Sequence, residues 1–91
     1  MAESSKRLSR EEYVENILLF LHKSERPSHN LKDIADAVGV SQATISGYVL
    51  YALASEYVVE QHVGPSKAYY LTDAGRKKVE EILAEQDKKK E

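Results

Sequence analysis

The segment 31–46 reads LKDIADAVGVSQATIS. Apolar residues in its first half recur three and four positions apart, the spacing of one buried helical face: Leu31, Ile34, Ala35 and Val38. Gly39 follows at once, where helices commonly end on a left-handed residue. Ser41 then offers a hydroxyl cap for another helix. The segment therefore predicts two helices, 31–38 and 42–55, joined by a tight turn.

A helix-turn-helix needs three features in such a pair of helices. A small residue lies where the helices cross, a glycine forms the sharp turn, and apolar side chains anchor the second helix on the first. Ala35 and Gly39 fill the first two positions. Ile34 and Ile45 are the anchors, and Val40 is expected to be buried beneath the turn. The segment thus predicts a helix-turn-helix.

The chain before this motif predicts one more helix. Ser9 and Glu12 have the spacing of a capping box, in which each side chain accepts the other residue's backbone N–H. The apolar residues that follow share one broad helical face: Tyr13, Val14, Ile17, Leu18, Phe20 and Leu21. This helix is expected to end near Lys23, before a break at residues 25–28. Asn30 then caps the first helix of the motif.

After the motif the hydrophobic pattern changes from helical to extended. Residues 57–63 are rich in β-forming side chains, residues 64–67 (GPSK) are typical of a turn, and residues 68–71 return as a second strand. A β-hairpin is therefore predicted. A short strand around residues 28–30 is expected to pair with it.

Thr72 is expected to cap a last helix that runs to about Glu85. The predicted fold is α+β, mainly α: a winged helix-turn-helix with a three-helix core, a β-hairpin wing and a C-terminal helix. It occupies residues 9–86, with a flexible N-terminal arm at 1–8 and a flexible charged tail at 87–91.

Composition excludes several classes of protein. The 91 residues suffice for one domain, and 42% hydrophobic with 31% charged residues is usual for a globular fold. Without cysteine, the chain has no disulfide, thiolate zinc site or cysteine nucleophile. The longest apolar run, 17–21, is too short to cross a membrane, and the first residues lack a signal peptide's apolar stretch. A cytoplasmic location, away from membranes, is expected.

Neither an enzyme nor a cofactor is predicted. His22, His29 and His62 fall on three different elements, so no metal site is expected. No nucleophile with a base, phosphate-binding loop or pair of catalytic carboxylates is recognisable.

The formal net charge is -2, which is unusual for a DNA-binding domain because contacts to phosphate supply most non-specific affinity. The acidic residues concentrate in the first and last helices: Glu11, Glu12, Glu15, Glu80, Glu81 and Glu85. The segment 30–56 is nearly neutral, with Lys32 against three carboxylates. Any binding to DNA is therefore expected to be modest in affinity and sensitive to salt.

Segment 31–46 resembles the helix-turn-helix of bacterial and archaeal transcriptional regulators. The hairpin, with residues 69–83 (YYLTDAGRKKVEEIL), resembles the wing and C-terminal helix of small MarR- or PadR-like winged-helix repressors. The resemblance covers about residues 11–83. It implies that the third helix enters the major groove of DNA, that the wing touches the adjacent backbone or minor groove, and that terminal helices form a homodimer.

Two positions depart from the family pattern. Gly47 stands where such families often have arginine, the commonest reader of guanine. A glycine inside a helix costs about 1 kcal/mol against alanine, which suggests that something approaches the backbone there. Glu56 and Tyr57 stand where family members often have a glycine, so the end of the third helix is left open by the sequence.

Ten residues are candidates for contact with DNA: Lys32, Ser41, Gln42, Ala43, Thr44, Ser46, Gly47, Tyr51, Ser66 and Lys67. Gln42 offers a bidentate contact to adenine, and Ala43 a contact to the thymine methyl group. The hydroxyls of the third helix suit phosphate oxygens, and Lys32 and Lys67 are the best-placed phosphate cations. Tyr51 either contacts the groove of DNA or supports the hairpin.

The candidate dimer interface consists of Val79, Ile82 and Leu83, because a small domain offers little core to cover them. The leading interpretation is a sequence-specific regulator that binds double-stranded DNA as a homodimeric repressor. The alternative is a winged-helix module that binds protein and not DNA, favoured by the net charge and by Gly47. A regulator that also senses a small molecule is a variant of the first interpretation.

Overall fold

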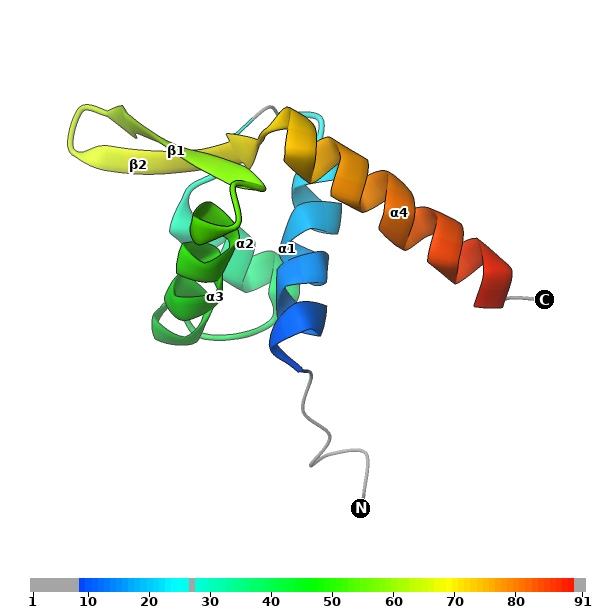
Figure 1. Ribbon diagram of the computed structural model, residues 1–91. Coiled ribbons are helices and arrows are strands. Elements are labelled where there is room, and N and C mark those ends of the chain that lie inside the picture. The colour runs from blue at the N-terminus through cyan, green and yellow to red at the C-terminus, as the bar shows by residue number, and fades with distance from the viewer. Residues whose placement is uncertain (1–8, 27, 90–91) are drawn as a thin grey trace, which may run out of the picture.

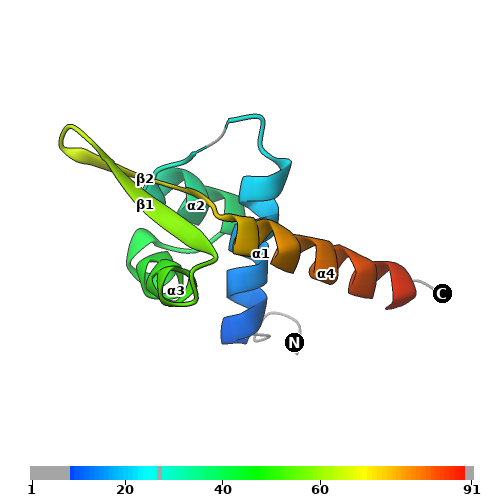
Figure 2. The ribbon, with the colours of Figure 1, turned by 45° about the horizontal axis from the view of Figure 1, so that its top comes forward.

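The computed structural model describes residues 9–26 and 28–89. Its elements follow the predicted order (Figure 1): α1 Arg10–Lys23, α2 Leu31–Val38, α3 Gln42–Ala54, β1 Val58–Val63, β2 Ser66–Leu71 and α4 Asp73–Lys89. The antiparallel hairpin β1–β2, the wing, extends from one side of helices α1 to α3, and α4 extends from the other side (Figure 2). The predicted winged helix-turn-helix is confirmed. The predicted N-terminal arm lies outside the described residues.

Side-chain caps begin the first three helices as expected. The Ser9 N–H donates to Glu12 Oε1 over 2.8 Å, and the Glu12 N–H donates to Ser9 Oγ over 3.2 Å, which completes the capping box. Asn30 and Ser41 each accept the backbone N–H three residues further on, at 2.8 and 3.2 Å. These contacts satisfy backbone donors that would otherwise lack a partner in the first turn.

The hydrophobic core is shared by all four helices. α1 contacts α2, α3, α4 and β2. The largest fully buried side chains are Ile17, Leu18, Ile34, Ile45, Val49 and Val79. Burying one such aliphatic side chain stabilises the fold by roughly 1.5–3 kcal/mol. Packing of these faces, more than helix propensity, therefore holds the short helices in place.

The core extends further along α4 than expected. Val79 is fully buried and Ile82 is 5% exposed within a single chain, because α4 packs against α1. A partner is therefore not needed to cover these two residues, which corrects their assignment to a dimer interface. Leu83, 38% exposed, is the one of the three candidates that a partner can still cover. The helix continues past Glu85 to Lys89.

The wing has a tighter turn than predicted. Val63 pairs with Ser66 in the antiparallel register, so the connection shrinks to Gly64 and Pro65. Gly64 has a φ of 61°, in the left-handed region that a two-residue hairpin turn favours for glycine. β2 therefore starts two positions earlier than the sequence pattern suggested.

His29 joins the wing to the helical core through a single β-bridge, where a short strand was expected at residues 28–30. It makes an isolated bridge with Tyr69, with N–H···O distances of 3.1 and 2.8 Å. Its ring is buried against Phe20, with Nδ1 3.2 Å from Asp33 Oδ2 and Nε2 hydrogen-bonded to the Ser24 hydroxyl. These contacts give His29 a structural role.

The end of α3, the base of the wing and the start of α4 meet at one joint. Glu56 has a φ of 65°, a left-handed conformation that glycine adopts at lower cost. Thr72 donates its backbone N–H to the Tyr57 carbonyl over 3.0 Å and its hydroxyl to the Glu56 carbonyl. The same hydroxyl accepts the Gly75 N–H at 3.0 Å, which confirms Thr72 as the cap of α4.

Gly75→Ala tests this joint. A β-carbon at Gly75 would overlap the Tyr57 carbonyl oxygen and lie 3.0 Å from Leu71 Cδ2, so the joint has to open. We expect the free energy of unfolding to fall by about 2 kcal/mol or more, measured by urea denaturation. Ala74→Ser, at the exposed neighbouring position, is the control and is expected to change stability by less than about 0.5 kcal/mol. Equal stabilities of the two variants would contradict the contact.

Candidate nucleic-acid interface

Helices α2 and α3 have the geometry of a helix-turn-helix. They are bent by 105° at the turn, within the range of about 90–120° typical of the motif. Gly39 has a φ of 90°, and its N–H donates to the Ala35 carbonyl over 2.8 Å. Ile34, Ala35 and Ile45 are fully buried at the crossing, as predicted, and Val40 packs against the core. The angle and rotation of α3 are therefore fixed by this crossing.

The rotation of α3 gives it one buried and one exposed face. Ile45, Val49 and Ala52 are buried, and Tyr48 is half-buried and stacks on Tyr13 with ring centroids 4.5 Å apart. The outward residues match the expectation: Gln42, Ala43, Gly47 and Tyr51 are exposed, and Ser46 is half-buried. The helix is therefore half embedded in the core and half presented outward.

The sequence analysis missed Leu50, which is 63% exposed and is the most exposed large hydrophobic residue of the described chain. It lies four positions after Ser46 and eight after Gln42, so helical spacing alone places it on the outward face. The sequence analysis assigned Leu50 to neither face, although this spacing was available.

A groove of about 520 Å³ separates α3 from the inner face of the wing. Five of the ten predicted DNA contacts line it: Lys32, Gln42, Ser46, Ser66 and Lys67. Leu50 lies on its α3 wall and Pro65 at its wing end. We call this the α3–wing groove. It brings together residues that are distant in sequence.

The other five candidates lie outside the α3–wing groove. Ala43 and Gly47 are on the exposed surface of α3. Ser41 is occupied as a cap and also donates its hydroxyl to Thr44 Oγ1 over 3.0 Å. Tyr51 lies on the α1 side, with the Arg10 guanidinium 5.2 Å from its ring centroid. Its ring is exposed, so contact with the groove of DNA stays a prediction.

Glu60 places a carboxylate on the inner face of the wing. The Tyr69 hydroxyl donates to Glu60 Oε2 over 3.0 Å, Lys67 Nζ lies 3.8 Å from the same oxygen, and His62 Nε2 lies 3.3 Å from Oε1. The hydrogen bond from Tyr69, followed by the charge of Lys67, lowers the pKa of Glu60 below its usual value of 4.5. Burial, and then the hydrogen bond to Glu60, raises the pKa of Tyr69.

Both predicted phosphate cations have a carboxylate neighbour. Lys32 Nζ lies 3.9 Å from Asp36 Oδ2, and Lys67 Nζ lies 3.8 Å from Glu60. The lysines are more than half exposed, and exposed ion pairs at such distances contribute only about 0–1 kcal/mol. An incoming anion can therefore displace either carboxylate at little cost.

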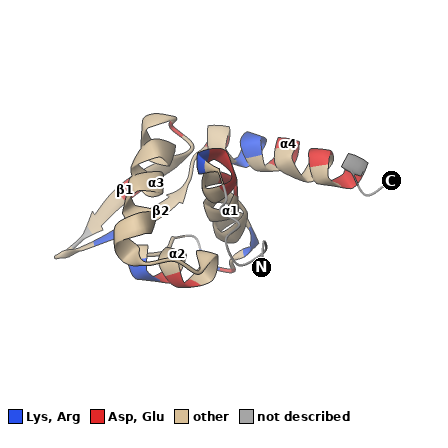
Figure 3. Cartoon of the chain, turned by 90° about the horizontal axis from the view of Figure 1, so that it is seen from below, with Lys and Arg blue, Asp and Glu red and all other residues tan. Residues whose placement is uncertain are grey.

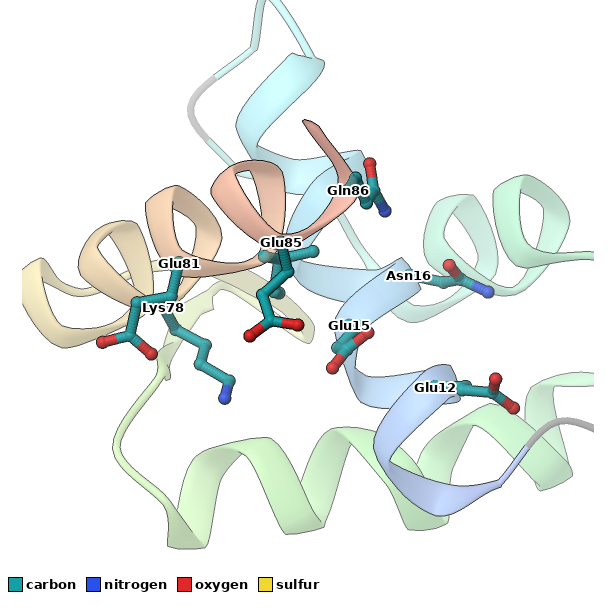
Figure 4. A pocket seen from close by; sticks show the side chains of 8 residues that line it. Glu12, Glu15, Asn16, Lys78, Glu81, Glu85 and Gln86 are labelled. Carbon is teal, nitrogen blue, oxygen red and sulfur yellow. The ribbon is translucent and has the colours of Figure 1, made fainter. Parts of the chain in front are cut away.

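Charge is divided between two sides of the molecule. α3 carries no charged residue (Figure 3). A cleft of about 390 Å³ between α1 and α4 is instead lined by Glu12, Glu15, Glu81 and Glu85, with Lys78 as its cation (Figure 4). Four carboxylates repel phosphate, so a duplex is electrostatically disfavoured at this cleft and tolerated at α3.

Within residues 9–26 and 28–89, no group of three or more His, Asp or Glu residues is placed to hold a metal ion. No single helix of this part of the chain is both long and apolar enough to span a membrane. Helices α2 and α3, which are bent by 105° at the turn between them, have the length and apolar composition of a membrane span only when they are counted as one segment.

No protein-family model and no curated protein sequence matches the chain. Solved structures share its fold. MepR, a transcription regulator of the Staphylococcus aureus multidrug efflux pump MepA, has a TM-score of 0.80 at 20% identity, over 86% of this chain and 58% of MepR. BpsR of Bordetella bronchiseptica, whose DNA binding is regulated by 6-hydroxynicotinic acid, has a TM-score of 0.74 at 25% identity, over 86% and 61%.

AbsC, a MarR family transcriptional regulator from Streptomyces coelicolor, has a TM-score of 0.72 at 20% identity, over 86% of this chain and 53% of AbsC. The chain spans less than two thirds of the length of each of these three proteins. It is structurally similar to MarR-family winged-helix regulators, one of the two families that its sequence resembles. These neighbours are transcription regulators and not enzymes.

Gly47→Ala tests whether the fold itself needs the glycine in α3. No atom lies within 4 Å of the position that a β-carbon would take, so alanine introduces no clash. We expect the free energy of unfolding to rise by about 1 kcal/mol and the melting temperature by about 4–8 °C. Differential scanning calorimetry measures both. A lower melting temperature would reveal an internal role for Gly47.

Tyr69→Phe tests the Glu60 contact. Because the pKa of Glu60 is lowered in the folded state, the contact stabilises the fold above pH 4.5 and is lost as the pH falls below that value. Urea denaturation should therefore show a larger loss of stability from Tyr69→Phe at pH 7 than at pH 3. In a Glu60→Gln background the loss should be the same at both pH values. An unaltered pH dependence in the parent background would contradict the assignment.

Proposed function

We propose that the chain is a sequence-specific regulator of transcription that binds double-stranded DNA, with α3 in the major groove and the wing on the adjacent backbone. It acts as a homodimeric repressor on a pseudo-palindromic site. The observation that carries the proposal is the exposed, uncharged face of α3 beside the wing. A helix-turn-helix, in which α2 and α3 are bent by 105°, holds this face in place.

The exposed face of α3 has the chemistry that a major groove accepts. Gln42 lies in the first turn, where a side-chain amide can bond both N6 and N7 of adenine. Ala43 and Gly47 add no bulk and no charge to the same face, so the helix backbone can approach base edges closely. No carboxylate of α3 opposes the phosphates on either side of the groove.

The cations at the two ends of the α3–wing groove supply the backbone contacts. Lys32 at the start of α2 pairs with the exposed Asp36, and Lys67 on the wing pairs with the half-buried Glu60. On binding, each lysine would exchange its carboxylate neighbour for a phosphate oxygen of DNA. The lysine charge then stays paired, and counterions are released from the DNA. This exchange accounts for binding by a chain with a net charge of -2.

Structural neighbours support the proposal. One variant of MepR, with a TM-score of 0.78 and 20% identity, was solved bound to an oligodeoxyribonucleotide. DNA binding is also named for BpsR. Such similarity at low identity supports a shared docking mode through the common fold.

Dimerisation is proposed from the exposed end of α4. Its C-terminal half extends away from the other helices (Figure 1) and carries Leu83 at 38% exposure. Binding to a pseudo-palindromic site requires this pairing to hold the two copies of α3 about 34 Å apart, one turn of B-DNA. Sedimentation that finds a monomer at tens of micromolar would remove the dimer from the proposal.

Binding to protein in place of DNA is the rival function, and one experiment separates the two. In vitro selection from a random duplex pool at low salt is expected to enrich related half-sites in inverted orientation. The proposal is overturned if no sequence is enriched and no gel shift occurs with the protein at tens of micromolar. The protein-binding module would then be the remaining interpretation.

Lys67→Ala tests the wing as a backbone contact. Loss of one phosphate contact should weaken all duplexes about equally and reduce the slope of log affinity against log salt by about one. Fluorescence anisotropy over a salt series measures the slope. Lys77→Ala, an exposed lysine on α4, is the matched control and should leave the slope unchanged. Equal slopes for Lys67→Ala and the parent chain would remove the wing from the interface.

A further inference from the structure

The outward face of α3 lacks the groups that read guanine and cytosine. Guanine is read in the major groove mainly by Arg or Lys, and cytosine by Asp or Glu, and none of these occurs between Gln42 and Ala54. The nearest lysines, Lys32 and Lys67, are flexible, exposed and outside α3. Direct readout by this helix therefore depends on amide, hydroxyl and apolar groups.

Leu50 supplies the largest apolar group on that face. It is 63% exposed, and it does not belong to the buried core or to the partly buried residues packed against it. Folding of the single chain therefore does not account for a leucine here. In water its exposed methyl groups are unfavourable, so contact with an apolar ligand is favourable.

The position of Leu50 on α3, as well as its exposure, favours contact with a base edge. Gln42, Ser46 and Leu50 follow one another at intervals of four residues and all line the α3–wing groove. Gln42 leads this row, and its amide matches the donor and acceptor of adenine. The one apolar group that base pairs offer in the major groove is the C5-methyl of thymine. The row thus presents an adenine reader followed, two turns later, by a methyl-contacting side chain.

We infer that Leu50 is a specificity-determining residue that contacts a thymine methyl group, and that the half-site read by α3 is A·T at the positions facing Gln42 and Leu50. The inference rests on the proposed function and deepens it, because it names the base pairs that the same surface selects. Ala43, exposed at the start of the helix, offers a smaller contact of the same kind.

Uracil substitution tests the inference directly, because uracil differs from thymine only by the absent methyl group. The selected duplex is made with each thymine replaced singly by uracil, and each duplex is titrated with the parent chain and with Leu50→Ala. At one position per half-site the parent chain should lose about fourfold in affinity, the equivalent of one buried methyl group. Leu50→Ala should bind the thymine and uracil duplexes equally at that position.

Val59→Ala is the matched control, since this side chain is also apolar and exposed but does not line the α3–wing groove. It should keep the fourfold discrimination, and circular dichroism should show that both variants are folded. Equal binding of all thymine and uracil duplexes by the parent chain overturns the inference and leaves the proposed function intact. Discrimination that persists in Leu50→Ala overturns the role of Leu50. Failure of the parent chain to bind any duplex overturns both.

Discussion

The packing of Ile34 and Ala35 on α2 against Ile45 on α3 is the contact on which the rest of the structure depends. The small side chain of Ala35 lets the two helices approach, and the two isoleucines fix the rotation of α3. Gly39 permits the sharp turn because its φ of 90° is accessible to glycine at no steric cost. Once this rotation is set, the helical repeat determines which residues of α3 are buried and which face outward. The proposed contacts of α3 with DNA follow from that division.

A second constraint holds the wing in a defined place beside α3. The left-handed Glu56, the Tyr57 carbonyl and the hydroxyl of Thr72 connect the end of α3, the base of β1 and the start of α4 in one small joint. The bridge from His29 to Tyr69 ties the other strand to the loop before α2. The base of the wing is therefore held beside α3 through both of its strands.

The placement of the charged residues on the surface matters more for contact with phosphate than the net charge does. A net charge of -2 would argue against contact with phosphate if the carboxylates were evenly spread. Four carboxylates line the α1–α4 cleft, whereas α3 carries none. Asp36 and Glu60, the carboxylates near the α3–wing groove, each lie within 4 Å of a lysine. This arrangement makes the α1–α4 side of the molecule unfavourable for phosphate and leaves the α3 side free of that repulsion.

The sequence by itself determined the local elements: the caps at Ser9, Asn30 and Ser41, the turn at Gly39, the hairpin and the helical faces. Each depends on residues within about four positions of one another, and such interactions can be read from spacing. Only the tertiary structure decided that Val79 and Ile82 are buried in one chain and that Lys67 lies against Glu60. These outcomes depend on packing between segments that are distant in sequence. The local sequence pattern around an apolar or charged residue is the same whichever surface covers it.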